Sequence, residues 1–195
     1  MTLSVISGGG AGRLGFVNLV LRAFAFLLRL GFVVARRDGT FVRFEKENVF
    51  VNVYHGRSSY QVGLELGRVH ESDIYSLHEL LSAMTPADIE QARCQTTDPE
   101  MLERCLSSIA ATIEQRCGHL LTGDVNAFEK LDAAVAPRRR AATLQAQFGA
   151  VIDRADKAWE AKEFSKAAAL YEKSEPGLDE TRMRRLEYLR KHERE

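Results

Sequence analysis

Residues 49–54 read VFVNVY, which is the most β-prone run in the chain. Val49, Val51 and Val53 alternate with the residues between them, so they share one face of an extended strand. Branched and aromatic side chains favour this conformation because they pack well on a pleated surface. The run therefore predicts a strand with one face turned to a core.

Three further strands flank this run, and short polar turns join all four. The earlier pair, residues 32–35 and 40–44, is separated by Arg37-Asp38-Gly39, where Asp-Gly is a tight-turn signal. The later strand, residues 60–67, alternates apolar and polar side chains and follows a turn at residues 55–58. Because these connections are too short for crossover helices, we expect a four-stranded antiparallel meander within an α+β fold.

An apolar stretch from Phe16 to Ala35 precedes the sheet and begins as a helix. Asn18, Arg22 and Arg29 are spaced by four and seven residues, so they form one narrow polar stripe on that helix. A charge at the centre of a membrane-spanning helix costs about 2.5 to 3.5 kcal/mol, and this stretch contains two arginines. We therefore expect a helix that packs on the sheet of a cytoplasmic protein, with neither a signal peptide nor a membrane span.

Helix signals dominate after residue 75. The predicted helix starts, each with a capping side chain or a proline in the first turn, are Ser76, Thr85, Asp98 and Asp124. Ser76 and Glu79 have the spacing of a capping box. The helix that starts at Asp98 shows apolar residues at spacings of three and four, which predict that it continues to about Leu121.

The helical pattern breaks at residues 136–140, which read APRRR, because proline does not continue a helix. This break predicts a domain boundary. We expect a flexible Gly-rich leader at residues 1–15, an α+β domain at 16–136 and a helical hairpin extension at 137–195.

The helical extension resembles part of a tetratricopeptide repeat. In that family an aromatic residue at the bend is followed by a small residue three positions on and an aromatic residue four positions later. Phe164, Ala167 and Tyr171 occupy these positions, and the resemblance covers about 25 residues. Because a solenoid needs roughly three such units, the resemblance implies a helical hairpin and not a peptide-binding array.

The charge balance gives no global sign of a nucleic-acid or membrane partner. Lys and Arg total 27, as do Asp and Glu, so the formal net charge is zero. Arg138-Arg139-Arg140 and the basic C-terminal helix could contact phosphates. In that helix, however, glutamates interleave with the arginines at pairing distance, which indicates a solvated surface. We expect neither nucleic acid nor a membrane as partner.

The cysteines predict reduced thiols. Cys94, Cys105 and Cys117 make an odd number, with ten and eleven residues between them, which is typical of a cytosolic protein and not of a disulfide framework. Structural zinc sites have closely paired ligands. The sequence therefore predicts free thiols, no metal site and no cofactor.

The Gly-rich leader leaves one enzymatic alternative open. Residues 10–15 read GAGRLG and fit the G-x-G-x-x-G pattern, with Asp38 about 20 residues further on as a candidate ribose ligand. On this reading Gly10, Gly12 and Gly15 would hold a nucleotide. A dinucleotide fold needs a second crossover helix, whereas Asp38-Gly39 turns directly into the next strand. A flexible leader is therefore the favoured interpretation.

Residues 16–131 resemble a group of uncharacterised small bacterial α+β proteins, some of which are similar to immunity proteins of polymorphic-toxin systems. The segments that carry the resemblance are the leading helix and residues 42–45, 49–54, 57–60, 64–68 and 120–124. The resemblance implies an α+β fold and an expectation of protein binding. It implies no catalytic residue.

One hairpin turn carries the candidate binding residues, which are Tyr54, His55, Arg57 and Tyr60. Arginine and tyrosine are common interface anchors, and an edge hairpin would expose them. Aromatic packing at a strand end is the alternative interpretation of the same cluster. Asn52, Gln61 and Glu65 further suggest a solvated sheet face that is available to a partner.

Candidate acids and bases also occur between Glu65 and Glu79, but no nucleophile with a partner base accompanies them. Loop polarity and helix capping account for these residues. The sequence therefore predicts a non-catalytic protein-binding protein, of immunity or adaptor type, and not an enzyme.

Overall fold

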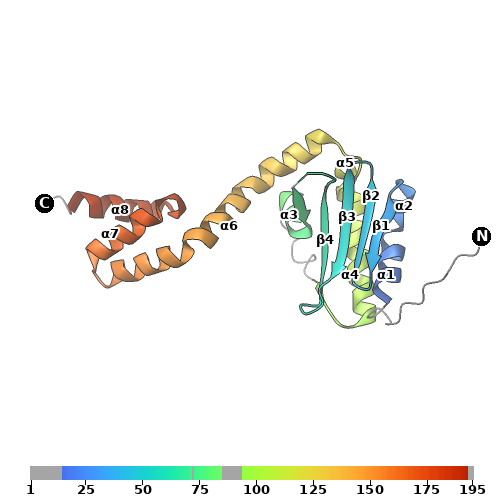
Figure 1. The fold of residues 1–195 in the computed structure, drawn as a ribbon, viewed down its shortest axis with the longest axis horizontal. Coiled ribbons are helices and arrows are strands. Elements are labelled where there is room, and N and C mark those ends of the chain that lie inside the picture. Colours follow the sequence, from blue (N-terminus) through green and yellow to red (C-terminus); the bar gives the residue numbers. More distant parts are fainter. Residues whose placement is uncertain (1–14, 72, 85–93, 193–195) are drawn as a thin grey trace, which may run out of the picture. The chain divides into compact units, whose positions relative to one another are not determined.

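The computed structural model describes residues 15–71, 73–84 and 94–192 (Figure 1). The chain divides after Asp132 into two compact units, which we call the sheet unit and the helical unit. The elements in chain order are α1 (Phe16–Ala23), α2 (Ala25–Arg29), β1 (Val33–Asp38), β2 (Phe41–Lys46), β3 (Val49–His55), β4 (Gln61–Arg68), β5 (Ile74–Ser76), α3 (Leu77–Met84), β6 (Cys94–Gln95), α4 (Pro99–Arg116), α5 (Gly118–Leu121), α6 (Val125–Glu160), α7 (Phe164–Lys173), the 3-10 helix η4 (Glu175–Gly177) and α8 (Glu180–His192). Among these helices, none is long and apolar enough to cross a membrane.

The sheet is antiparallel at every strand pair, in the order β1-β2-β3-β4-β5, and β6 also pairs with β4. The predicted α+β class and the meander of the first four strands are confirmed. The prediction lacked β5 and β6. These strands have three and two residues, which is too short for a readable alternation, and only their pairing with β4 defines them.

Helices cover one face of the sheet, because α1 contacts β2 and α4 contacts β4 while α1 and α4 also contact each other. Figure 1 shows the strands in front of both helices. The predicted first helix is divided at Phe24 into α1 and α2, and Phe24 is buried there with its ring 6.2 Å from that of Phe44. The predicted polar stripe is exposed to solvent, since Arg22 and Arg29 form exposed ion pairs with Glu103 and Glu114 of α4.

Local capping chemistry sets the helix starts. The Ser76 backbone N–H donates to Glu79 Oε2 at 2.8 Å, and the Glu79 N–H donates back to Ser76 Oγ at 3.3 Å, as in a capping box. Asp98 Oδ1 accepts the Met101 N–H at 2.8 Å, and Asp124 Oδ1 accepts the Asn126 N–H at 2.9 Å. These three predicted starts are confirmed. The start predicted at residues 85–86 lies outside the described residues.

The predicted long helix from Asp98 ends earlier than expected. The helix α4 stops at Arg116, and α5 follows as a separate short turn of helix. Cys117, between them, is fully buried. The apolar spacing continues through this junction because both helices turn apolar residues toward the same core, so periodicity alone did not reveal it.

The prediction of three free thiols is wrong for two of the cysteines. Cys94 of β6 and Cys105 of α4 form a disulfide, with their Cα atoms 6.1 Å apart. Their sequence separation gave no sign of this, because the tertiary fold brings β6 against the start of α4. Cys117 stays outside the disulfide. Burial raises the pKa of its thiol to about 12.

The predicted helix break at residues 136–140 is also wrong. The helix α6 continues from Val125 to Glu160 with Pro137 inside it, and the boundary between the two units falls within this helix. Proline removes one backbone donor and disfavours the preceding turn, but the other residues of a long helix can offset that cost. The three-part domain division remains a prediction.

The helical unit has its own small core. The end of α6 packs with α7 and α8 around Ala155, Ala167, Tyr171 and Leu186. Ala167 and Tyr171 are fully buried, as the tetratricopeptide-like spacing would require, whereas Phe164 remains 44% exposed. The unit is therefore a helical hairpin with a third helix, built partly from alanines that allow close approach.

Candidate functional site

The face of the sheet opposite α1 and α4, which we call the open face, carries an ordered row of polar side chains. Strand register aligns Arg43 with Asn52, Asn52 with Glu65, and Glu65 with Ser76. We call Arg43, Asn52, Glu65 and Ser76 the polar row. It crosses four neighbouring strands, although its members are distant in sequence.

Hydrogen bonds tie the centre of the polar row together. Arg43 Nη1 donates to Asn52 Oδ1 at 3.3 Å, and Asn52 Nδ2 donates to Glu65 Oε2 at 3.0 Å. Arg43 Nε also donates to a carboxylate oxygen of Glu45. The Arg43 side chain is only 25% exposed and Asn52 is buried, so these groups are held in place and partly removed from water.

An aromatic residue paired with a glycine lies on each side of the polar row. Tyr54 is aligned with Gly63, and Phe50 is aligned with Gly67. A Cβ atom added to Gly63 would lie 2.2 Å from Tyr54 Cζ, which means that the Tyr54 ring lies flat across β4. The Phe50 ring likewise lies against Gly67, and the guanidinium carbon of Arg43 is 3.9 Å from the centre of that ring. On the open face, therefore, Phe50 is buried beneath Arg43, and Tyr54 is a half-buried ring that lies over β4.

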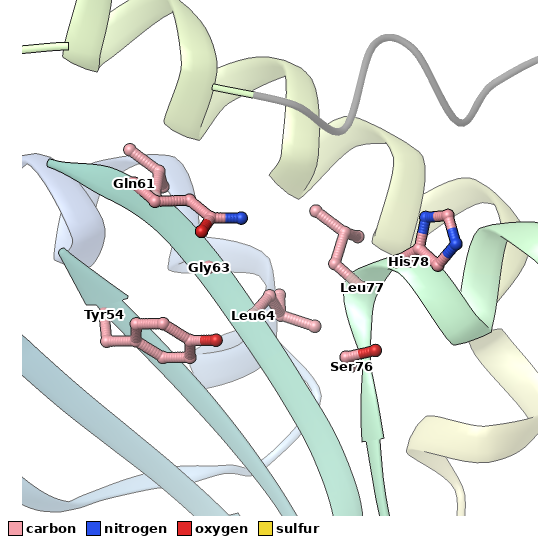
Figure 2. Close-up of a pocket in the computed structure, with 8 residues that line it drawn as sticks. Tyr54, Gln61, Gly63, Leu64, Ser76, Leu77 and His78 are labelled. Carbon is pink, nitrogen blue, oxygen red and sulfur yellow. The ribbon is translucent and has the colours of Figure 1, made fainter. Parts of the chain in front are cut away.

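A pocket of about 300 Å³ lies at the edge of this face, between β4 and the start of α3. It occurs where β4 is paired with β6 at residues 61–62 and with β5 at residues 65–67, which leaves Gly63 and Leu64 between the two pairings. Figure 2 shows Tyr54 and Gln61 on one side of the pocket and Ser76, Leu77 and His78 on the other.

The polar groups of this pocket do not form a nucleophile and base pair. Ser76 Oγ donates to Glu79 Oε2 at 2.9 Å, so its hydroxyl belongs to the helix cap. His78 is exposed. Burial, and then the charge of Glu65, raise the pKa of Tyr54, so its phenol is neutral at neutral pH and can donate a hydrogen bond. The pocket offers donors and an aromatic surface for binding.

The four binding residues predicted from the sequence divide between two places, because His55, Arg57 and Tyr60 line a depression at the turn and Tyr54 lines the pocket of the open face. His55 is 4% exposed and faces the helix side, where its ring stacks on Phe16 at 5.9 Å, whereas Tyr54 lies on the open face. His55 Nε2 is 3.1 Å from the Tyr60 carbonyl oxygen and 3.0 Å from that of Thr96, so it holds the segment after β6 against the turn. His55 is a structural residue.

The remaining two residues lie around a depression of about 330 Å³ at the turn, which His55, Arg57 and Tyr60 line together with Thr40 and Gly56. Arg57 is exposed and Tyr60 is half-buried. Tyr60 adopts a φ of 53°, in the left-handed region, because the chain reverses there into β4. The turn therefore presents one exposed arginine and part of a tyrosine ring.

The nucleotide-site alternative falls mostly outside the described residues, because Gly10 and Gly12 lie there. Gly15 has a φ of 63° and directly precedes α1, where a left-handed residue starts the helix. Within residues 15–71, 73–84 and 94–192, no group of three His, Cys, Asp or Glu side chains is placed to hold a metal ion.

The sequence predicted that Asn52 and Glu65 are solvated, but Asn52 is buried and Glu65 is half-buried. It missed Arg43, Phe50 and the two glycines. The two glycines of β4 are four residues apart and so share one face, which was a usable signal, since a strand glycine often marks the close approach of another group. The identity of that group follows only from register.

Comparison of the chain with protein-family models, with curated proteins and with solved structures found no match.

Proposed function

We propose that this chain works by binding another protein, in an immunity-type or adaptor role, and that the open face of the sheet is the surface it uses. The observation that carries the proposal is the ordered centre of that face, where Arg43, Asn52 and Glu65 are linked by hydrogen bonds between the rings of Phe50 and Tyr54. Interface cores are enriched in aromatic residues and arginine. Side chains that are already fixed lose less conformational entropy when a partner binds.

A non-catalytic role is part of the same proposal. The Ser76 hydroxyl is engaged in capping, and the raised pKa of Cys117 keeps that buried thiol protonated and poorly nucleophilic. Saturating nucleotide should then leave the melting temperature unchanged. A shift that Gly12→Val abolishes would instead favour the nucleotide-binding enzyme.

We propose the cytoplasm as the place of action, because Arg22 and Arg29 interrupt the apolar stretch that a signal peptide or a membrane span would need. The Cys94–Cys105 disulfide removes one support for this location, because disulfides persist mainly in oxidising compartments. Cell fractionation with thiols trapped by alkylation tests both points. Recovery of the oxidised protein outside the cytoplasm would contradict the location and leave the binding proposal intact.

The binding proposal is tested by affinity purification of the tagged full chain from its native cell. The open-face variant is Arg43→Ala with Tyr54→Ala, and the turn variant is Arg57→Ala with Tyr60→Ala. The matched control is Arg22→Ala with Glu103→Ala, which removes an exposed ion pair on the helix side. Circular dichroism establishes that each variant is folded.

We expect the wild type, the turn variant and the control to recover the same stoichiometric partner, and the open-face variant to recover at least tenfold less. Loss in the turn variant alone would move the binding surface to Arg57 and Tyr60. Recovery of no stoichiometric partner by the wild type would contradict the proposed function.

A further inference from the structure

The helical unit contains a second aromatic surface, which the open face does not explain. Trp159 near the end of α6, Phe164 at the start of α7 and Tyr188 in α8 form an aromatic groove of about 370 Å³ together with Arg184 and Arg185. The Trp159 ring centre is 5.7 Å from that of Phe164 and 6.0 Å from that of Tyr188, and both contacts are edge-on. A groove of this volume can accept one large apolar side chain.

The rings of this aromatic groove remain open to solvent. Phe164 is 44% exposed and Tyr188 is 51% exposed, although the buried core of the three helices lies next to them. Trp159 packs against that core, which fixes the floor of the groove. Clustered exposed rings of this kind commonly mark a binding surface.

The two arginines of the groove play different parts. Arg185 lies with its guanidinium carbon 5.2 Å from the Trp159 ring centre, and its Nη1 donates to Asp156 Oδ1 at 3.1 Å. It is therefore fixed over the ring. Arg184 pairs with Glu180 across one helical turn, where both side chains are more than 70% exposed. Such a surface pair contributes little and can exchange for another carboxylate.

The two arginines make the aromatic groove positively charged, which favours an anionic ligand over a cationic one. Both charged side chains that line it are arginines, and Lys and Arg outnumber Asp and Glu in residues 133–195 as a whole. A cationic ligand is disfavoured, because Arg185 already occupies the face of Trp159 that would attract it. An anionic ligand gains from Arg184 without displacing Arg185.

From these contacts we propose that the aromatic groove binds an acidic segment of another protein, which places one apolar side chain among the three rings and pairs a carboxylate with Arg184. The site lies in the helical unit and is independent of the open face, so either proposal can fail without the other. It gives the chain two binding surfaces, one in each unit.

The groove contains its own reporter, because Trp159 is the only tryptophan in the chain. The full-length protein is titrated with an acetylated and amidated peptide, Asp-Glu-Leu-Phe-Glu-Asp, and binding is followed by Trp159 fluorescence and by calorimetry. One comparison peptide replaces the four acids by lysine, and another replaces Leu and Phe by serine. We expect saturable binding of the first peptide and at least tenfold weaker binding of the other two.

The variants Arg184→Glu and Tyr188→Ala should each weaken binding of the acidic peptide by at least tenfold. The matched control is Arg154→Glu, which makes the same charge change at an exposed position of α6 outside the groove. The proposal is overturned by the absence of saturable binding, by equal binding of the lysine or serine peptide, or by an equal loss in Arg154→Glu.

Discussion

Asp156 is the residue on which the polar contacts of the helical unit converge. Its carboxylate accepts the Tyr171 hydroxyl at 2.7 Å, the Arg182 guanidinium at 2.8 and 3.0 Å, and Arg185 Nη1 at 3.1 Å. Burial by itself raises the pKa of Asp156, but the hydrogen bonds and charges of Arg182, Tyr171 and Arg185 outweigh it and hold that pKa below its ordinary value. The ionised carboxylate thus ties α6 to α7 and α8.

This lowered pKa predicts acid sensitivity of the helical unit. The stabilisation is fully present above the unfolded-state pKa of about 3.9 and is lost as the pH falls through the lower folded-state pKa. We expect Asp156→Asn to lower the free energy of unfolding by about 1 to 3 kcal/mol at pH 7. The difference from wild type should shrink below about pH 4. Urea titrations followed by Trp159 fluorescence measure it, and a difference that is constant with pH would contradict the assignment.

Gly67 and Gly63 differ in the atoms that a Cβ atom, added by substitution, would contact. At Gly67 a Cβ atom would lie 2.8 Å from the backbone oxygen of Asp73 and 2.8 Å from Phe50 Cζ. At Gly63 it would meet only the Tyr54 ring among its three nearest atoms. A ring can rotate away, whereas a backbone oxygen cannot move without shifting the chain between β4 and β5.

We therefore expect Gly67→Ala to lower the free energy of unfolding by about 1 to 3 kcal/mol, and Gly63→Ala to cost less. When Tyr54→Ala removes the ring, Gly63→Ala should become neutral or slightly stabilising, because alanine restricts the unfolded chain. Urea denaturation of the four proteins measures the double-mutant cycle. An unchanged cost of Gly63→Ala in the Tyr54→Ala background would show that the ring does not lie over this glycine.

The element that departs most from expectation is α6, because it passes through Pro137 without ending. Proline has no backbone N–H, so the carbonyl of Ala133 lacks its usual partner four residues on. Pro137 and its neighbours Ala136 and Arg138 are exposed, so the ring meets solvent and not a packed helix. The helix tolerates the free-energy cost of the missing hydrogen bond, and replacing Pro137 should remove that cost.

We expect Pro137→Ala to raise the free energy of unfolding by up to about 3 kcal/mol, since alanine restores the helical hydrogen bond. The matched control is Ala142→Pro, at an exposed position in the same helix, which should lower it by a similar amount. Thermal unfolding followed by circular dichroism at 222 nm gives both values. Destabilisation by Pro137→Ala would mean that the proline serves a structural role.

At the scale of the whole molecule, a disulfide that the cysteine count and spacing did not predict crosslinks the sheet unit. The Cys94–Cys105 disulfide joins the strand β6, which pairs with the start of β4, to the helix α4 that covers one face of the sheet. The two cysteines are 11 residues apart in sequence. The link therefore restrains a short loop of the unfolded chain as well as the packing of α4.

Replacing both cysteines by serine should lower the free energy of unfolding by about 2 to 4 kcal/mol. A reductant should destabilise the wild type and leave the Cys94→Ser, Cys105→Ser protein unchanged, which is the internal control. Thiol titration of the unreduced, denatured wild type should find only Cys117. Reaction at all three cysteines would show that the disulfide does not form.

The sequence alone determined the class of fold, the order of the four longest strands, and the helix starts at Ser76, Asp98 and Asp124. Each of these depends on interactions within a few residues, such as alternation along a strand or a side chain that caps the next turn. Such interactions are encoded locally, so a single sequence is enough to read them.

Only the tertiary structure decided the Cys94–Cys105 disulfide, the packing of His55 against Phe16 of α1, and the polar row of the open face. These features join residues from different elements, and strand register determines which side chains meet. A shift of one residue in register would turn every side chain of a strand to the other face. For this reason the sequence could place Asn52 and Glu65 on one face of the sheet, but only the paired strands showed that Asn52 is buried between Arg43 and Glu65.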